Sequence, residues 1–206
     1  NKYDDNIFFQ KYSQMSRSQQ GLAGAGEWET LRKLLPDFKD KRVLDLGCGY
    51  GWHCIYAMEH GASSVVGVDI SHKMLEVAKE KTHFPQVEYK CCAIEDVEFP
   101  EESFDVILSS LAFHYVADYE ILVKKIYRIL KSGGKLVFTV EHPVFTAYGT
   151  QDWHYNEKGE ILHFPVDNYY YEGKRTAVFL GEKVTKYHRT LTTYLNTCLL
   201  YTSPSP

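Results

Sequence analysis

Residues 43–51, with the sequence VLDLGCGYG, combine a carboxylate with a glycine-rich turn. Gly47, Gly49 and Gly51 follow a short apolar run, and Asp45 lies inside that run, two residues before the first glycine. Glycines let a backbone adopt positive φ and approach a ligand closely. A carboxylate in a cleft of low dielectric constant attracts a cation and repels a pyrophosphate. The stretch therefore favours a ligand that carries an ammonium or a sulfonium group.

A second acid, Asp69, ends the next apolar run, roughly 20 residues after Gly47. At this spacing a carboxylate can accept hydrogen bonds from ribose hydroxyls, both in dinucleotide sites and in adenosyl sites. Ile70 follows and is expected to lie against a purine face. The dinucleotide fingerprint G-x-G-x-x-G would need a glycine where Trp52 stands. Asp69 by itself fits both a dinucleotide and an adenosyl compound. Trp52 and Asp45 favour the adenosyl compound.

The elements that must position these residues alternate between strand and helix signals from residue 41 onward. Ser71 is a good N-cap for a helix that carries Met74, Val77 and Ala78. A second helical face, 119–130, is expected to stop at Gly133-Gly134. Strands are predicted at 42–47, 65–69, 87–91, 104–109 and 135–140. The pattern predicts a doubly wound, mainly parallel Rossmann-like α/β sheet with helices on both faces, which binds ligands beyond the carboxyl ends of its strands.

Four segments divide the chain. Residues 1–40 are expected to form a helical cap, with a helix at Glu27–Leu35, and residues 41–142 the ligand-binding core. Residues 143–188 are rich in aromatics, with a turn at 156–159, and suggest strands or a hairpin inserted after the fifth strand. This insert is predicted to be a lid over the substrate, or alternatively a small hairpin with its own aromatic core. Residues 189–206 begin with a helical pattern and end in a tail.

Bulk composition excludes several function classes. The chain has 206 residues, of which 44% are hydrophobic and 24% charged, with a net charge of −4. This balance gives no electrostatic footprint for nucleic acid or for an anionic membrane. No apolar run approaches the roughly 18 residues of a membrane span, and the polar start is unlike a signal peptide. Five cysteines without zinc or C-x-x-C spacing indicate reduced thiols, no metal site and a cytoplasmic protein.

Four successive stretches resemble the motifs of the class I S-adenosylmethionine-dependent methyltransferases: VLDLGCGYG, VVGVDIS, IEDVEFPEESFDVILSSLAFHYV and LKSGGKLVFTVEHPVF. The likeness is to the small-molecule branch, which includes the quinone-biosynthesis type, and it runs from about residue 10 to 195. It implies S-adenosylmethionine as cofactor and a small molecule as methyl acceptor. The oligomeric state and the acceptor are not indicated by the sequence.

The resemblance also implies roles for individual positions. Gly47 and Gly49 would wrap the methionine part of the cofactor, with Asp45 near its ammonium group, and Asp69 would bind the ribose. Tyr12, Met15 and Arg17 are expected to close over the cofactor. Many family members carry an acid for the adenine amino group where this chain has Ala93. The remaining contacts are expected from Ile94 and Glu95, which would flank the adenine, and from Ser110 and Leu111, which would line the methionine side.

Methyl transfer from a sulfonium is an in-line displacement, and a general base is required only for an acceptor that must lose a proton. Histidine is the natural choice near neutral pH. His114 follows the fourth predicted strand and His142 the fifth, so both are candidate bases, with Glu141 a candidate to orient His142. For each histidine, a structural role with a bond to backbone is an equally good interpretation.

The same family resemblance predicts two further strands beyond the helical pattern of Leu191, Tyr194, Leu195, Cys198 and Leu199. The segment CLLYTSPSP resembles translated adapter sequence. The native sequence is therefore expected to end near Thr197, so that the sheet lacks its last two strands. The alternative is a genuine short tail.

Two other functions stay open at this stage. A non-catalytic adenosyl-binding or sensing module fits the lack of a decisive catalytic residue. A nicotinamide-dependent oxidoreductase is disfavoured by Trp52 and Asp45.

Overall fold

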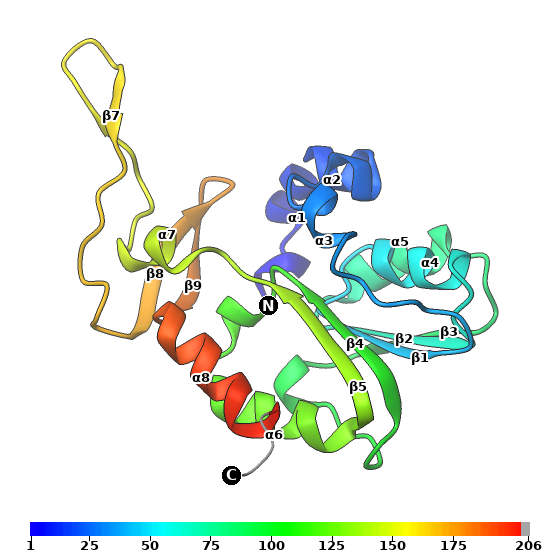
Figure 1. Ribbon diagram of the computed structural model, residues 1–206. Coiled ribbons are helices and arrows are strands. Elements are labelled where there is room, and N and C mark those ends of the chain that lie inside the picture. Colours follow the sequence, from blue (N-terminus) through cyan, green and yellow to red (C-terminus); the bar gives the residue numbers. More distant parts are fainter. Residues whose placement is uncertain (203–206) are drawn as a thin grey trace. The chain divides into compact units, whose positions relative to one another are not determined.

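Five parallel strands form the central sheet of the computed structural model, which describes residues 1–202. The strand order is β3-β2-β1-β4-β5, so the order reverses between β1 and β4 (Figure 1). All four pairings are parallel, which confirms the predicted doubly wound α/β sheet. The strands are β1 (Arg42–Leu46), β2 (Ser64–Asp69), β3 (Val87–Cys91), β4 (Phe104–Ser110) and β5 (Leu130–Thr139).

Burial on both faces explains why β1 and its neighbours carry apolar runs rather than alternating patterns. Val43, Leu44 and Leu46 are fully buried, as are Val65 and Val68 of β2. Strands of a parallel sheet are covered on both faces, so each position gains from an apolar side chain. Asp45 is the polar exception inside β1, with 1% of its surface exposed. A polar residue there has to be explained by function rather than by packing.

Two helices link the first three strands. Helix α4 (Trp52–Glu59) joins β1 to β2, and α5 (His72–Lys81) joins β2 to β3. The Ser71 hydroxyl accepts a hydrogen bond from the Met74 amide, which confirms the predicted N-cap. Met74 and Ala78 are buried on the sheet side of α5. Figure 1 shows α4 and α5 on the same side of the sheet.

The N-terminal segment is helical in short pieces. They are η1 (Lys2–Asp4), α1 (Asn6–Ser13), α2 (Ser16–Gln19), η2 (Gly21–Gly24) and α3 (Trp28–Leu31). The helix expected at Glu27–Leu35 is shorter than predicted. The amides of Lys33 and Leu34 bond to carbonyls three residues back, and Pro36 disfavours a helical conformation at Leu35.

The passage from helix to strand before β5 differs from the prediction. Helix α6 (Tyr119–Ile129) ends directly before β5, and Gly133-Gly134 lie inside that strand instead of stopping the helix. The register of β4 against β5 shifts between Phe104, opposite Leu130, and Val106, opposite Lys135. Gly133 has φ of 74°, so this glycine absorbs the extra residues as a local irregularity. Two short 3₁₀ helices, η3 (Ile94–Asp96) and η4 (Phe113–Tyr115), follow β3 and β4.

The described chain divides into two compact units, residues 1–112 with 125–139, and residues 113–124 with 140–202. In the second unit, β6 and β7 form an antiparallel hairpin around the predicted turn at 156–159, and β8 and β9 form a second hairpin. The expectation of strands in this insert is confirmed. The elements are α7 (Pro143–Ala147), β6 (His154–Tyr155), β7 (Ile161–His163), β8 (Gly173–Phe179), β9 (Glu182–His188) and α8 (Leu191–Thr202).

Helix α8 confirms the helical spacing predicted from residue 191. The predicted foreign tail lies partly in this helix, and its last four residues, 203–206, lie outside the described residues. The origin of the tail stays a prediction. Within residues 1–202, no helix is long and apolar enough to cross a membrane.

Glycine at position 51 is required by both conformation and space. Gly51 has φ of 75°, and a Cβ there would lie 2.2 Å from the Tyr89 hydroxyl oxygen. We expect Gly51→Ala to lower the free energy of unfolding by roughly 2–4 kcal/mol, from left-handed strain and overpacking together. Gly133→Ala is the matched control, because Gly133 has φ of 74° and open space around it. It should cost roughly 1–2 kcal/mol. Equal losses in urea denaturation would contradict the close approach of Tyr89.

Candidate functional site

The glycine loop lies at the point where the strand order reverses. It follows β1, which pairs with β2 on one side and β4 on the other. The amides of Gly47 and Cys48 donate to the Val68 carbonyl, at 2.8 and 2.9 Å. Gly47 has φ of 78°, and a Cβ there would lie 2.5 Å from the Ala112 Cβ. The loop is therefore held closely against the ends of both neighbouring strands, which is where open α/β sheets bind ligands.

Asp69 joins the end of β2 to this loop. One carboxylate oxygen accepts the Gly49 amide at 2.9 Å, and the other accepts the Ser71 amide at 2.9 Å. Burial raises the pKa of Asp69, and the bonds from Ser71 and Gly49 act in the opposite direction. Each oxygen keeps a second lone pair, so the carboxylate can still accept from two ribose hydroxyls. Ile70, beside it, exposes 49% of its surface and offers an apolar face.

Asp45 lies beneath the loop with an unsatisfied oxygen. Its Oδ2 accepts the Cys54 thiol at 3.5 Å, whereas Oδ1 is buried with no partner among the described residues. Burial raises the pKa of Asp45 to about 7; the Cys54 bond lowers it and the Asp69 charge raises it further. A buried carboxyl without partners is costly to ionise. A cationic ligand above the loop would favour the ionised form.

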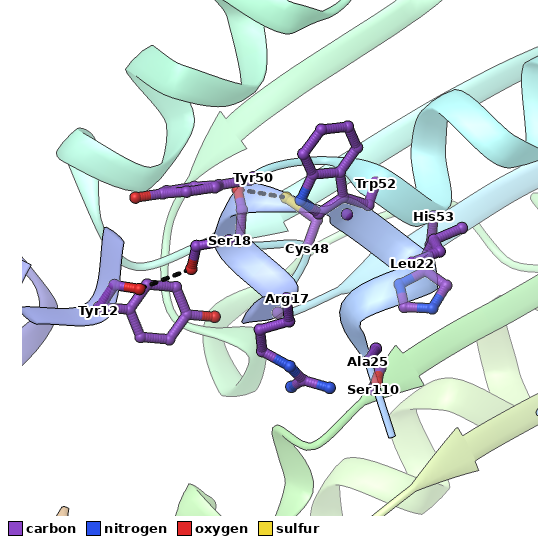
Figure 2. Close-up of a pocket in the computed structure, with 13 residues that line it drawn as sticks. Tyr12, Arg17, Ser18, Leu22, Ala25, Cys48, Tyr50, Trp52, His53 and Ser110 are labelled. Carbon is purple, nitrogen blue, oxygen red and sulfur yellow. Dashed lines mark hydrogen bonds between the residues drawn. The ribbon is translucent and has the colours of Figure 1, made fainter. Parts of the chain in front are cut away.

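A cavity of about 70 Å³ opens beside the loop, on the side of the N-terminal segment (Figure 2). All of its lining residues belong to the first unit. Tyr12 and Arg17 of the N-terminal segment line this cavity, whereas Met15 does not, and closure of the segment over the cofactor stays a prediction. The lining residues are Tyr12, Arg17, Ser18, Gly21, Leu22, Ala25, Gly47, Cys48, Gly49, Tyr50, Trp52, His53 and Ser110.

Arg17 supplies a cation to this cavity. Its guanidinium pairs with the Glu27 carboxylate, which also accepts the Ser110 hydroxyl at 3.1 Å. The indole Nε1 of Trp52 is buried and has no partner among the described residues. Burial lowers the pKa of His53 to about 4, so this ring is neutral at physiological pH. An arginine and an unpaired N–H donor in one cavity suit an anionic ligand group such as a carboxylate.

The remaining predicted cofactor residues occupy the ends of β3 and β4. Ser110 lines the cavity. Leu111 has φ of 53°, held by hydrogen bonds from its amide to the Thr139 carbonyl at 2.9 Å and hydroxyl at 3.1 Å. Such backbone strain in a leucine concentrates at ligand sites. Ile94 is buried and Glu95 is exposed in η3, and neither lines the cavity.

In the second unit, His114 is buried, with 2% of its surface exposed. Its Nδ1 accepts the Glu141 amide at 3.5 Å, and its Nε2 lies 4.0 Å from Glu141 Oε1. Burial lowers the pKa of His114 to about 4, against the opposing effect of Glu141. The ring is therefore neutral near pH 7 and has a nitrogen that can accept a proton.

Glu141 is also bonded to Lys186 and Gln151. Lys186 Nζ donates to Glu141 Oε1 at 2.5 Å and to Gln151 Oε1 at 2.9 Å, and Gln151 Nε2 donates to Glu141 Oε2 at 2.9 Å. The sequence analysis did not identify Lys186 or Gln151. The alternating pattern of β9 could have identified Lys186, because Val184, Lys186 and His188 occupy the buried face of this strand. A charged residue at an inward position of a strand indicates a paired charge.

His142 is in a different environment. It is exposed, and its Nδ1 accepts the Val144 amide at 3.1 Å as the N-cap of α7. The expectation that Glu141 orients His142 is not met, because the Glu141 carboxylate bonds to Lys186 and Gln151 and faces His114.

Comparison with known proteins agrees with this site. The Methyltransferase domain family matches residues 44–138. A solved structure from Listeria monocytogenes is 57% identical, with a TM-score of 0.82 over 85% of this chain and 83% of that one. A second, from Mesorhizobium loti and described as an S-adenosylmethionine-dependent methyltransferase, is 40% identical, with a TM-score of 0.81 over 88% of this chain and 83% of that one. A ubiquinone biosynthesis O-methyltransferase of Coxiella burnetii is 36% identical over 53% of this chain and 47% of its own length.

The reversed strand order and the glycine loop define a Rossmann-like fold with a nucleotide-type site at the carboxyl edge of its sheet. With these relatives, the chain belongs to the class I S-adenosylmethionine-dependent methyltransferases. It is an enzyme, and its cofactor is S-adenosylmethionine. The dinucleotide alternative and the non-catalytic alternative are therefore set aside. Among residues 1–202, no group of three or more His, Cys, Asp or Glu side chains could hold a metal ion.

Asp69→Ala should weaken binding of S-adenosylhomocysteine by about 1.5–3 kcal/mol, the scale of hydrogen bonds to a charged group. Calorimetric titration measures this loss. Asp105→Ala is the matched control, because Asp105 also accepts a backbone amide, that of Arg42 at 2.9 Å, at the opposite edge of the sheet. Affinity within twofold of the parent in Asp69→Ala would place the ribose elsewhere.

Asp45 predicts a pH-dependent affinity for the cofactor. Because its pKa is raised to about 7 in the free protein, the carboxyl is increasingly protonated below that pH and attracts a cation less. Affinity for S-adenosylhomocysteine should therefore fall as pH is lowered from 7.5 to 5.5, by up to about tenfold per unit below 7. Asp45→Asn should remove this dependence. A parent protein with constant affinity over this range would contradict the prediction.

Proposed function

We propose that the protein transfers the methyl group of S-adenosylmethionine to a hydroxyl of a small-molecule acceptor, with His114 as general base. The observation that carries the proposal is a buried neutral imidazole next to a carboxylate, His114 with Glu141. An acceptor nitrogen or thiolate needs no such base, whereas a hydroxyl does. The likeness to a ubiquinone biosynthesis O-methyltransferase supports a hydroxyl acceptor. The net charge of −4 offers no surface suited to nucleic acid.

The cofactor contacts follow from the carboxyl edge of the sheet. We assign the ribose hydroxyls to Asp69 and the methionine carboxylate to Arg17. The ammonium group would lie above Asp45, whose free oxygen it would stabilise in the ionised form. Gly47, Gly49, Ser110 and Leu111 would wrap the methionine part. Ile70 and Ile94 would flank the adenine. Glu95, in η3 after β3, would replace the acid that many family members have at the position of Ala93.

When bound, the cofactor supplies an activated methyl group on a sulfonium. His114 would take the proton that the acceptor hydroxyl loses on Nδ1, the ring nitrogen that accepts the Glu141 amide at 3.5 Å in the free protein. The Glu141 carboxylate then stabilises the imidazolium. The chain's largest contribution is to hold acceptor and methyl group in line, which can supply about 7–11 kcal/mol. The aromatic insert, with Tyr148, Trp153, Tyr155 and residues 169–171, would cover the acceptor and exclude water.

His114→Gln should lower kcat by about 10²–10⁴, with affinity for S-adenosylhomocysteine unchanged. The assay follows labelled methyl transfer from S-adenosylmethionine to a panel of phenols, catechols and hydroxylated quinone precursors. His142→Asn is the control, because asparagine can keep the N-cap of α7. It should retain nearly full activity. Equal activity of His114→Gln and the parent would leave an enzyme that works by alignment alone.

A further inference from the structure

One carboxylate oxygen in the second unit faces two possible partners. Glu141 Oε1 lies 2.5 Å from Lys186 Nζ and 4.0 Å from His114 Nε2. The first distance is a charge-assisted hydrogen bond, and the second is too long for a hydrogen bond. Gln151 closes a ring by donating to Glu141 and accepting from Lys186, both at 2.9 Å. The ring holds the carboxylate on the lysine side.

The burial of Lys186 makes this arrangement more than a surface ion pair. Its surface is 2% exposed, and that of His114 is also 2% exposed. An ammonium group is rarely buried unless it is paired, and a well-packed apolar residue would fill the same volume at least as stably. The position therefore points to a role for the charge itself. His114 shares the carboxylate with this charge and is the group that can respond to it.

We propose that Lys186 is a positioning residue, which competes with His114 for the Glu141 carboxylate and so, together with burial, disfavours protonation of the histidine. The consequence for catalysis rests on the proposed role of His114 as base. While Lys186 holds the carboxylate, His114 stays neutral and ready to accept a proton. When the imidazole takes a proton, the same carboxylate is near enough to turn to it.

The groups that face His114 come from three elements. Glu141, after β5, favours the imidazolium, whereas Lys186 of β9 and Arg189 just beyond it disfavour it. The fourth neighbour is the Tyr115 ring, whose centroid lies 4.4 Å from that of His114. Arg189 is held by the carbonyls of Val116 and Ala117 and so stays in place when Lys186 is changed. Loss of the lysine charge leaves the Glu141 charge to act on His114, and the histidine should titrate at higher pH.

Nuclear magnetic resonance of the histidine ring protons tests this without acceptor and without activity. The His114 signal is assigned by its loss in His114→Gln. In Lys186→Met the His114 titration midpoint should rise by at least about one pH unit, the effect of an opposite charge at close range. Lys186→Gln, which can still bond to Glu141 and Gln151, replaces the methionine variant if that variant folds poorly. It should shift the His114 titration midpoint in the same direction. In the double variant Lys186→Met, Glu141→Gln, the rise should disappear.

An unchanged midpoint in both single variants would overturn the proposal, as would a rise that persists in the double variant. The pH–rate profile of an active acceptor gives a second readout, because its acidic limb should move with the His114 midpoint. If the midpoint moves but His114→Gln keeps full activity, the proposed base is wrong while the competition for Glu141 stands. If the midpoint does not move but His114→Gln is inactive, the base stands and the role of Lys186 is wrong.

Discussion

The burial of the Asp45 carboxyl beneath the glycine loop is the constraint on which the cofactor site depends. The position lies in a strand covered on both faces, where an apolar residue would pack better, and one oxygen has no partner among the described residues. Asp69 fixes the same loop from the next strand through the Gly49 amide. Asp69 thus bonds to the loop itself, whereas Asp45 bonds to Cys54 of α4 and keeps one oxygen free. The two acids together suit a ligand with a cationic end and a ribose.

The rest of the first unit serves this arrangement. The reversed strand order leaves β1 and β4 side by side with diverging connections, so their carboxyl ends can take a ligand. The N-terminal segment lines the cavity with Arg17 and Tyr12 rather than contributing to the sheet. In the second unit, a carboxylate shared among a lysine, a glutamine and a histidine forms a separate polar centre. Asp45, Asp69 and the glycine loop belong to the first unit, and His114 belongs to the second.

Much of this could be predicted from sequence because it depends on local patterns. Apolar runs predicted the five strands, and Ser71 predicted the start of α5. The spacing of Asp45, Gly47 and Asp69 indicated the class of ligand. The passage through Gly133-Gly134 could not be predicted, because a glycine pair also fits a helix stop and only the pairing with β4 decides. The choice between His114 and His142, and the partners Gln151 and Lys186, depend on contacts between residues 10 to 45 positions apart in sequence. Sequence periodicity carries no such information.

The central claim is that the Asp45 carboxyl is ionised by the cofactor's ammonium group. Calorimetric titration at pH 6, in buffers of different ionisation enthalpy, counts the protons released on binding. For S-adenosylhomocysteine the account predicts release of about one proton, because the carboxyl is mostly protonated in the free protein at that pH. For 5′-methylthioadenosine, which keeps the ribose and adenine but lacks the amino acid, it predicts no release. Binding of S-adenosylhomocysteine with no release of protons would contradict it.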